Sequence, residues 1–138
     1  MTYTSSSPEE TKKIAEDFAK TLKGGECLCM YGDLGAGKTA FVQGLGKGLG
    51  ISEHINSPTF TIVNEYQGRL MLYHFDVYRI SDPEEMFFIG FDEYLENGGV
   101  TVIEWAELIE DILPKSRCNI TITKDGFEDK RNITIEVV

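Results

Sequence analysis

A glycine-rich octapeptide carries the residue types that most clearly indicate chemistry. It runs Gly32-Asp33-Leu34-Gly35-Ala36-Gly37-Lys38-Thr39 and matches the pattern G-x-x-x-x-G-K-[ST]. In this pattern the glycines let the backbone approach phosphate oxygens closely, and N–H groups at the start of the following helix point at the anion. The Lys side chain reaches the β- and γ-phosphates, and the Thr hydroxyl ligates Mg²⁺. The sequence therefore predicts a P-loop that binds a nucleoside triphosphate and hydrolyses it.

The context of this loop supports the same interpretation. The apolar run Cys27–Tyr31 comes directly before it and is typical of a buried strand, and a helix is expected from Lys38 to about Leu49. A strand, a glycine loop and a helix in this order are the context that the pattern requires. We expect the nucleotide to contact the loop and the first helical turn, which comprise Asp33, Leu34, Gly35, Ala36, Gly37, Lys38, Thr39 and Ala40.

Two acidic residues stand at the ends of later apolar runs. Asp76 ends the run Leu70–Asp76, and Glu104 ends the more continuous run Val100–Glu104. A P-loop site needs an acidic group near its metal. One of the two is therefore expected to hold Mg²⁺ or its water shell, while the other orients or activates the attacking water. Spacing alone leaves the assignment open, and a solvated strand end is the alternative for either residue.

Three further residues are candidates for the same site. Thr59 lies in the segment Asn56–Phe60, between the P-loop helix and the next strand. In switch-type NTPases that connection carries a hydroxyl that senses the γ-phosphate and the metal. Trp105 directly follows the second acid and either packs near the nucleotide or belongs to the core or an interface. Arg79 either faces a phosphate or pairs with an acid.

The helices and strands that must position these residues can be predicted from local features of the sequence. Ser7, Pro8 and Glu10 form the N-cap, the first helical position and a capping box, and the helix that they start is expected to end at Gly24-Gly25. Glycines in the second helix are expected to permit close packing against a sheet; they are Gly44, Gly46 and Gly48. Phenylalanines in the helical segments are interpreted as core residues; they are Phe41, Phe87, Phe88 and Phe91.

The rest of the chain alternates hairpins with βαβ units. We expect a hairpin across Gln67-Gly68-Arg69 and one helical stretch from Asp82 to Asn97. The remaining expected elements are strands at 59–66, 70–78, 100–104, 117–123 and 131–137 and a short helix at 106–112. The sequence thus predicts a three-layer α/β P-loop NTPase domain with a mixed parallel and antiparallel sheet. We expect residues 1–138 to form this single domain.

Composition limits the classes of partner. The chain has 138 residues and a formal net charge of −10, because 23 acidic residues face 13 basic ones. Nucleic-acid affinity depends mainly on Lys and Arg neutralising phosphates, so strong binding to DNA or RNA by this chain alone is not expected. A negative surface is suited to docking onto a basic protein.

Cysteine usage and the chain start indicate a compartment. Cys27, Cys29 and Cys118 have no framework spacing and lack nearby metal-ligand partners, so we interpret them as free, structural thiols in a reducing environment. Cys27 and Cys29 are two apart on an expected strand and should share one face. The sequence shows neither a signal peptide nor a membrane-spanning apolar run. We therefore expect a cytoplasmic protein.

Four segments together resemble a known family. Gly32–Thr39, Ser57–Phe60, Tyr73–Arg79 and Val102–Trp105 follow one another at suitable distances and are similar to the motifs of the TsaE (YjeE) family of bacterial P-loop ATPases. The similarity extends over about Ser7 to Ile112. The P-loop alone would not identify this family, whereas the combination of four motifs is highly specific.

The resemblance implies a role in making threonylcarbamoyladenosine in tRNAs that read codons beginning with A. It implies ATP and Mg²⁺ as cofactors and low intrinsic ATPase activity. It also implies TsaB and TsaD as protein partners that hold the tRNA. By the same resemblance Lys38 and Thr39 are nucleotide and Mg²⁺ ligands, Glu104 is the metal-site acid, and Asp76 is a catalytic or water-orienting residue. Thr59 becomes a switch residue, and Trp105 a site or interface residue.

Three alternatives were weighed against this hypothesis. A small-molecule kinase needs a lid with several arginines, and the four arginines here are scattered along the chain. A GTP-dependent switch usually needs an Asn/Thr-Lys-x-Asp element, and the nearest segment, Thr123–Gly126, has the wrong spacing. A purely structural nucleotide-binding protein would show binding without turnover.

Overall fold

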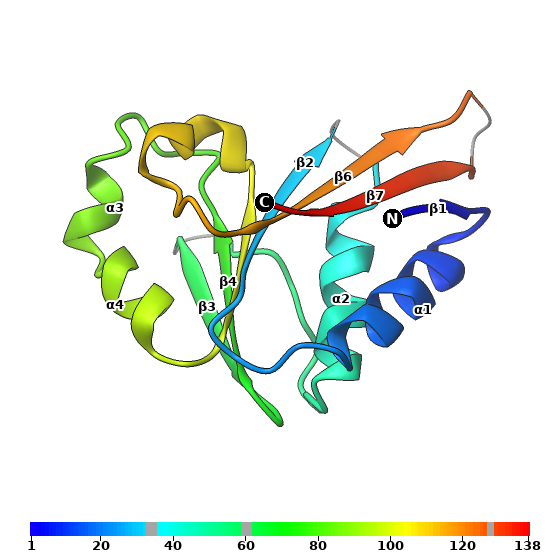
Figure 1. Ribbon diagram of the computed structural model, residues 1–138, viewed down its shortest axis with the longest axis horizontal. Helices are drawn as coiled ribbons and strands as arrows, with labels where there is room; N and C mark the ends of the chain where they lie inside the picture. The colour runs from blue at the N-terminus through cyan, green and yellow to red at the C-terminus, as the bar shows by residue number, and fades with distance from the viewer. Residues whose placement is uncertain (33–35, 59–61, 127–128) are drawn as a thin grey trace.

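The computed structural model of the protein, drawn as a ribbon in Figure 1, describes residues 1–32, 36–58, 62–126 and 129–138. Strands and helices alternate along the first half of the chain, and the last two strands form an antiparallel hairpin. In chain order the elements are β1 (Thr2–Ser5), α1 (Pro8–Ala19), β2 (Cys27–Gly32), α2 (Lys38–Gly48), β3 (Val63–Gln67), β4 (Met71–Asp76), α3 (Glu85–Phe88), α4 (Phe91–Glu96), β5 (Val100–Glu104), the 3₁₀ helix η1 (Ala106–Ile112), β6 (Cys118–Lys124) and β7 (Arg131–Val137).

Within the described ranges, the strands form one seven-stranded sheet in the order β1-β7-β6-β2-β5-β4-β3. The four central strands β6, β2, β5 and β4 are parallel to one another. Both edges are antiparallel, because β1 pairs with β7, β7 with β6, and β3 with β4. The β3–β4 pairing confirms the predicted hairpin, and the sheet confirms the predicted mixed α/β fold.

Helices cover both faces of this sheet (Figure 1). Helices α1 and α2 lie on one face, over a core that includes Leu28, Met30 and Val102. Helices α3 and α4 and η1 lie on the other face, over Cys29, Phe75 and Ile103. Of the phenylalanines interpreted as core, Phe41 and Phe91 are fully buried, whereas Phe87 and Phe88 are exposed, so the prediction was wrong for that pair.

Helix α1 starts as predicted and ends earlier than predicted. The Ser7 hydroxyl accepts a hydrogen bond from the Glu10 N–H at 3.1 Å, and Pro8 takes the first helical position. The last helical residue is Ala19, not the Gly24-Gly25 pair. These glycines instead belong to the connection to β2, where the Gly25 N–H donates to the Gly99 carbonyl at 2.8 Å.

Gly44 and Gly48 of α2 pack against α1 and not against the sheet, whereas a Cβ on Gly46 would lie 2.0 Å from the Ile55 side chain. A Cβ on Gly44 would lie 2.2 Å from the Lys12 carbonyl oxygen, and one on Gly48 would lie 2.4 Å from the Glu16 carbonyl oxygen. Both distances are far inside van der Waals contact, so only glycine allows the two helices to approach this closely. The expectation of helix–sheet packing is corrected to helix–helix packing at these two positions.

The helical stretch expected from Asp82 to Asn97 is divided in two. Gly90, with φ +81°, separates α3 from α4 and is the N-cap of α4. The predicted start signal orders the turn before α3, since the Glu85 carboxylate accepts the N–H groups of Ser81 and Asp82 at 2.9 and 3.0 Å. The helix itself begins at Glu85.

The first strand was not predicted. Thr2–Ser5 pairs with Arg131–Thr134 of β7, at the far end of the chain. Ser5 is fully buried, and its hydroxyl hydrogen bonds that of Thr11 at 2.8 Å. A short polar segment of this kind has no apolar alternation of its own, so the partner strand determines its conformation.

Candidate functional site

A cavity of about 310 Å³ lies where β2, β4 and β5 end beside the start of α2. Its lining comprises Gly37, Lys38, Thr39, Ser57, Asp76, Glu104 and Trp105. The residues come from four separate parts of the sequence, and they include the four side chains for which the sequence analysis predicted catalytic or metal-binding roles. The carboxyl ends of parallel strands meet at one sheet edge, which is where ligands bind in open α/β sheets.

The described P-loop residues end strand β2 on one side and begin helix α2 on the other. Strand β2 ends at Gly32 with φ +140°, where a Cβ would lie 2.1 Å from the Ile122 carbonyl oxygen of β6. Gly37, with φ +106°, is the N-cap of α2, and its carbonyl accepts the Phe41 N–H at 3.0 Å. The predicted contact residues Asp33, Leu34 and Gly35 lie outside the described residues.

Two other predicted contact residues lie at the side of the loop. Ala36 is buried, and its carbonyl accepts a hydrogen bond from Arg131 Nε of β7 at 3.0 Å. Ala40, in the first turn of α2, lines a neighbouring cavity of about 140 Å³ together with Ala36 and Gly37. The contact from Arg131 was not foreseen, because 95 residues separate it from its acceptor.

Lys38 is buried although it is charged. Its side chain is 6% exposed, and its ammonium donates to the Gly32 carbonyl at 3.2 Å. The same nitrogen lies 3.6 Å from the centroid of the Trp105 ring, a cation–π contact. Trp105 is therefore part of the site, which is one of the alternatives that the sequence analysis left open. Its backbone φ of +64° is rare for a bulky residue and turns the chain from β5 into η1.

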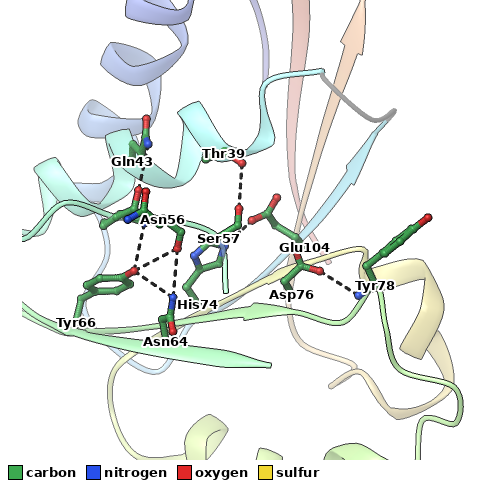
Figure 2. A network of polar contacts seen from close by, with 11 residues as sticks. Thr39, Gln43, Asn56, Ser57, Asn64, Tyr66, His74, Asp76, Tyr78 and Glu104 are labelled. Atoms are coloured by element: carbon green, nitrogen blue, oxygen red, sulfur yellow. Dashed lines mark hydrogen bonds and ion pairs between the residues drawn. The ribbon is translucent and has the colours of Figure 1, made fainter. Parts of the chain in front are cut away.

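The Thr39 hydroxyl points across the cavity to the segment after α2. Its Oγ1 lies 3.3 Å from Ser57 Oγ, as Figure 2 shows. Gln43 donates to the Ile55 carbonyl at 3.1 Å, which holds this segment against α2. Ser57 is thus a site residue that the sequence analysis quoted only as part of a motif. The predicted switch residue Thr59 lies outside the described residues, so its role stays a prediction.

The two predicted acids are register partners on adjacent parallel strands. Asp76 of β4 stands opposite Glu104 of β5. Asp76 Oδ1 accepts the Tyr78 N–H at 3.0 Å (Figure 2). Burial raises the pKa of the Asp76 carboxyl above its ordinary value, and the nearby Glu104 charge adds to this rise. Glu104 is almost fully buried.

His74 is the partner of Glu104. Its Nε2 lies 2.5 Å from Glu104 Oε2, and its ring is fully buried. Within the described part of the chain, His74 Nδ1 has no hydrogen-bond partner, which favours the tautomer that carries its proton on Nε2 and donates it to the carboxylate. No role was predicted for His74 from the sequence. The available signal was strand alternation, because His74 and Asp76 are two apart and share a face.

Arg79 is placed differently from the other candidates. It is exposed, and the cavity lining does not include it.

The sulfur atoms of Cys27 and Cys29 lie 3.8 Å apart on one face of β2, as predicted, and the three cysteines are free and buried. No helix among the described residues is long and apolar enough to cross a membrane. Nor do the described ranges contain a group of three or more His, Cys, Asp or Glu side chains that could hold a metal ion.

Comparison with known proteins gives one consistent result. A family model described as Threonylcarbamoyl adenosine biosynthesis protein TsaE matches residues 5–133. The tRNA threonylcarbamoyladenosine biosynthesis protein TsaE of Bacillus subtilis (strain 168) is 52% identical over 132 residues, which are 95% of this chain and 82% of that protein. The protein of the same name from Treponema pallidum (strain Nichols) is 42% identical over 98% of this chain and 99% of its own. A crystal structure of Bacillus subtilis YdiB matches with a TM-score of 0.84 at 45% identity, covering 100% of this chain and 85% of that one.

Proposed function

Because this chain belongs to the TsaE family of threonylcarbamoyl adenosine biosynthesis proteins, we propose that it is the ATP-hydrolysing subunit for threonylcarbamoyladenosine modification of tRNA. The tRNAs are those that read codons beginning with A. The observation that carries the proposal is the cavity at the start of α2, where Lys38 and Thr39 face Asp76 and Glu104. We expect slow hydrolysis by the isolated chain in the cytoplasm, and faster turnover with its partners.

The residues at the start of α2 fit a triphosphate and Mg²⁺. A helix N-terminus next to a buried ammonium is an anion-binding arrangement, and a Cβ on Gly37 would have no heavy atom of the described residues within 4 Å apart from Gly37 and its chain neighbours. Lys38 would contact the β- and γ-phosphates, while the Thr39 hydroxyl and the Glu104 carboxylate would hold Mg²⁺ or its waters. When bound, Mg²⁺ would supply neutralisation of charge on the β- and γ-oxygens.

The surroundings of the two acids favour different roles. Glu104 is buried and held by His74, which suits a carboxylate of fixed orientation in the metal shell. Asp76 is half-buried, and its raised pKa makes it a better proton acceptor than an ordinary aspartate. We therefore assign water orientation and activation to Asp76. Trp105 would keep the Lys38 ammonium over its ring and in place for the phosphates.

The partners in this proposal are TsaB and TsaD. The net charge of −10 disfavours direct contact with a phosphate backbone. The tRNA would therefore be held by the partner proteins, and this chain would contact it only through their complex.

Replacement of Lys38 tests the proposal directly. Lys38→Ala removes the cation that faces the cavity, so we expect ATP turnover to fall about 100-fold or more, and threonylcarbamoyladenosine to disappear from tRNA in cells that carry only this variant. Lys47→Ala is the matched control, because Lys47 is an exposed lysine on the same helix. Turnover is followed by phosphate release and modification by mass spectrometry of tRNA nucleosides. Normal modification with Lys38→Ala would refute the proposal.

A further inference from the structure

The net negative charge of the chain comes from one segment. Residues 80–114 contain ten of the 23 acidic residues and none of the 13 basic ones, so the rest of the chain has thirteen of each sign. This segment forms α3, α4, β5 and η1. Most of its acids are exposed; they are Asp82, Glu84, Asp92, Glu93, Glu96, Glu107, Glu110 and Asp111.

The same part of the molecule exposes large apolar side chains. Within the described ranges, the exposed large hydrophobic residues are Met1, Val137 and Val138 at the chain ends and a second group, which comprises Tyr78, Phe87, Phe88 and Leu108. Phe88 is 89% exposed. The neighbouring Met86 and Phe91 are fully buried and already anchor α3 and α4 to the sheet. The exposed phenylalanines are therefore not needed for the core, and exposed aromatic residues of this kind mark interaction surfaces.

These residues lie on the helical layer that covers one face of the sheet (Figure 1). The layer reaches the candidate site, because η1 starts directly after Trp105. The Tyr78 ring, which is exposed, lies 4.9 Å from the Trp105 ring, and Trp105 in turn contacts Lys38. We call the outer surface of α3, α4 and η1, with Phe87, Phe88, Leu108 and the exposed acids, the acidic face.

We infer that the acidic face docks a partner protein whose own surface has an apolar pocket ringed by Lys and Arg. The apolar residues supply the buried centre of such an interface, and the surrounding acids supply a charged rim that selects and orients the partner. A nucleic acid is excluded as the partner. Residues 80–114 contain ten acidic residues and no basic residue, and this charge repels phosphates. The inference rests on the proposed function, in which the partner is the TsaB–TsaD complex, and it assigns the surface that this complex would occupy.

A binding titration with the purified TsaB–TsaD complex of the same organism tests this inference. The fluorescently labelled full chain is titrated with the complex in the presence of ATP and Mg²⁺. Phe88→Ser and the double variant Glu84→Lys/Asp92→Lys should each raise the Kd at least tenfold, as expected for a central apolar anchor and for reversed rim charges. Higher salt should weaken binding of the unaltered chain.

Matched control variants carry the same kinds of substitution outside the acidic face. Val137→Ser removes another exposed apolar side chain, and Glu53→Lys/Glu136→Lys reverses two exposed acids outside residues 80–114. These variants should bind like the unaltered chain. ATP hydrolysis by each isolated variant should also stay unchanged, because none of the altered residues lines the cavity.

The outcomes separate the two proposals. If the unaltered chain binds the complex and both acidic-face variants bind equally well, or if the control variants lose as much affinity as they do, the acidic face is not the docking surface and the proposed function stands. If the unaltered chain does not bind the complex at all, the proposed partnership is wrong and the docking proposal falls with it.

Discussion

At the scale of single residues, the site depends on two carboxylates that end neighbouring strands in different surroundings. Asp76 is half-buried and accepts one backbone N–H, whereas Glu104 is buried and contacts His74. Two adjacent acids with different surroundings are a common arrangement where one binds a metal and the other moves a proton. The two predictions that follow test each acid separately.

Replacement of Asp76 should lower activity and raise stability. Burial raises the pKa of this carboxyl, so folding opposes its ionisation, and the ionised carboxylate lowers the free energy of unfolding at neutral pH. Asp76→Asn keeps an oxygen for the Tyr78 N–H and removes the charge. We expect ATP turnover to fall at least 100-fold, and the free energy of unfolding at pH 7 to rise by a few tenths to about 1 kcal/mol.

The pH dependence of stability follows from the raised pKa of Asp76. Well below about pH 4 the carboxyl is protonated in both the folded and the unfolded chain. The stability difference between Asp76→Asn and the unaltered chain should therefore be small there, grow as the pH rises from the unfolded-state pKa to the raised folded-state pKa, and be complete above it. Urea unfolding of both proteins at about pH 3 and pH 7 measures this difference. Equal stabilities at both values would contradict the buried, ionised carboxylate.

His74 should act on the reaction through Glu104. His74→Leu removes the donor to a buried carboxylate, which costs about 1 to 3 kcal/mol and lets the Glu104 side chain reorient. We expect turnover to fall about 10- to 100-fold, with a rise in the Mg²⁺ concentration needed for half-maximal activity. His74→Gln, which keeps an N–H donor, should recover part of the lost turnover and part of the Mg²⁺ affinity. An unchanged Mg²⁺ requirement in His74→Leu would show that His74 has only a structural role.

At the scale of elements, the contact between α1 and α2 determines where α2, the helix that we propose to bind phosphate, lies. Gly44 and Gly48 leave no space for a Cβ against the α1 backbone. Arg131 ties the loop before α2 to β7, and Gln43 ties the segment after α2 to the helix surface. Helix α2 and the loop before it are thus held by contacts with three different parts of the chain.

Alanine at Gly44 should destabilise the protein although alanine favours helices. The propensity gain is about 1 kcal/mol, whereas a Cβ 2.2 Å from the Lys12 carbonyl must push the two helices apart. Overpacking of this kind typically costs about 1 to 3 kcal/mol, so we expect a net loss of up to about 2 kcal/mol in urea unfolding. Lys47→Ala on the same helix should change stability by less than about 0.5 kcal/mol. A more stable Gly44→Ala protein would contradict the helix–helix contact.

At the scale of the whole molecule, the two faces of the sheet have different tasks. The α1–α2 side presents α2, the helix that we propose to bind phosphate, to the strand ends, and the opposite layer carries the net charge and the exposed aromatics. The candidate site lies between them, with Lys38 from one side against Trp105 at the start of η1. In the function that we propose, Trp105 therefore connects the hydrolysis site with the docking surface.

Most of the elements could be predicted, because their signals are local. The cap at Ser7, the hairpin and the buried strands each depend on residues that are close in sequence. The errors occurred where contacts with other segments of the chain determine the local structure. Strand β1 exists because β7 pairs with it, the end of α1 was wrongly assigned to glycines that serve another connection, and Gly90 divided a helix whose apolar pattern continued through it.

By itself the sequence identified the loop that we propose to bind phosphate, because the glycines, Lys38 and Thr39 lie within eight residues and a strand and a helix flank them. It also identified Asp76 and Glu104 as strand ends. Only the tertiary structure decided that these acids stand side by side, that His74 contacts Glu104 and that Trp105 lies over Lys38. The physical reason is that the tertiary fold brings together residues far apart in the sequence, such as Lys38 and Trp105 at 67 positions, and no local pattern specifies that pairing.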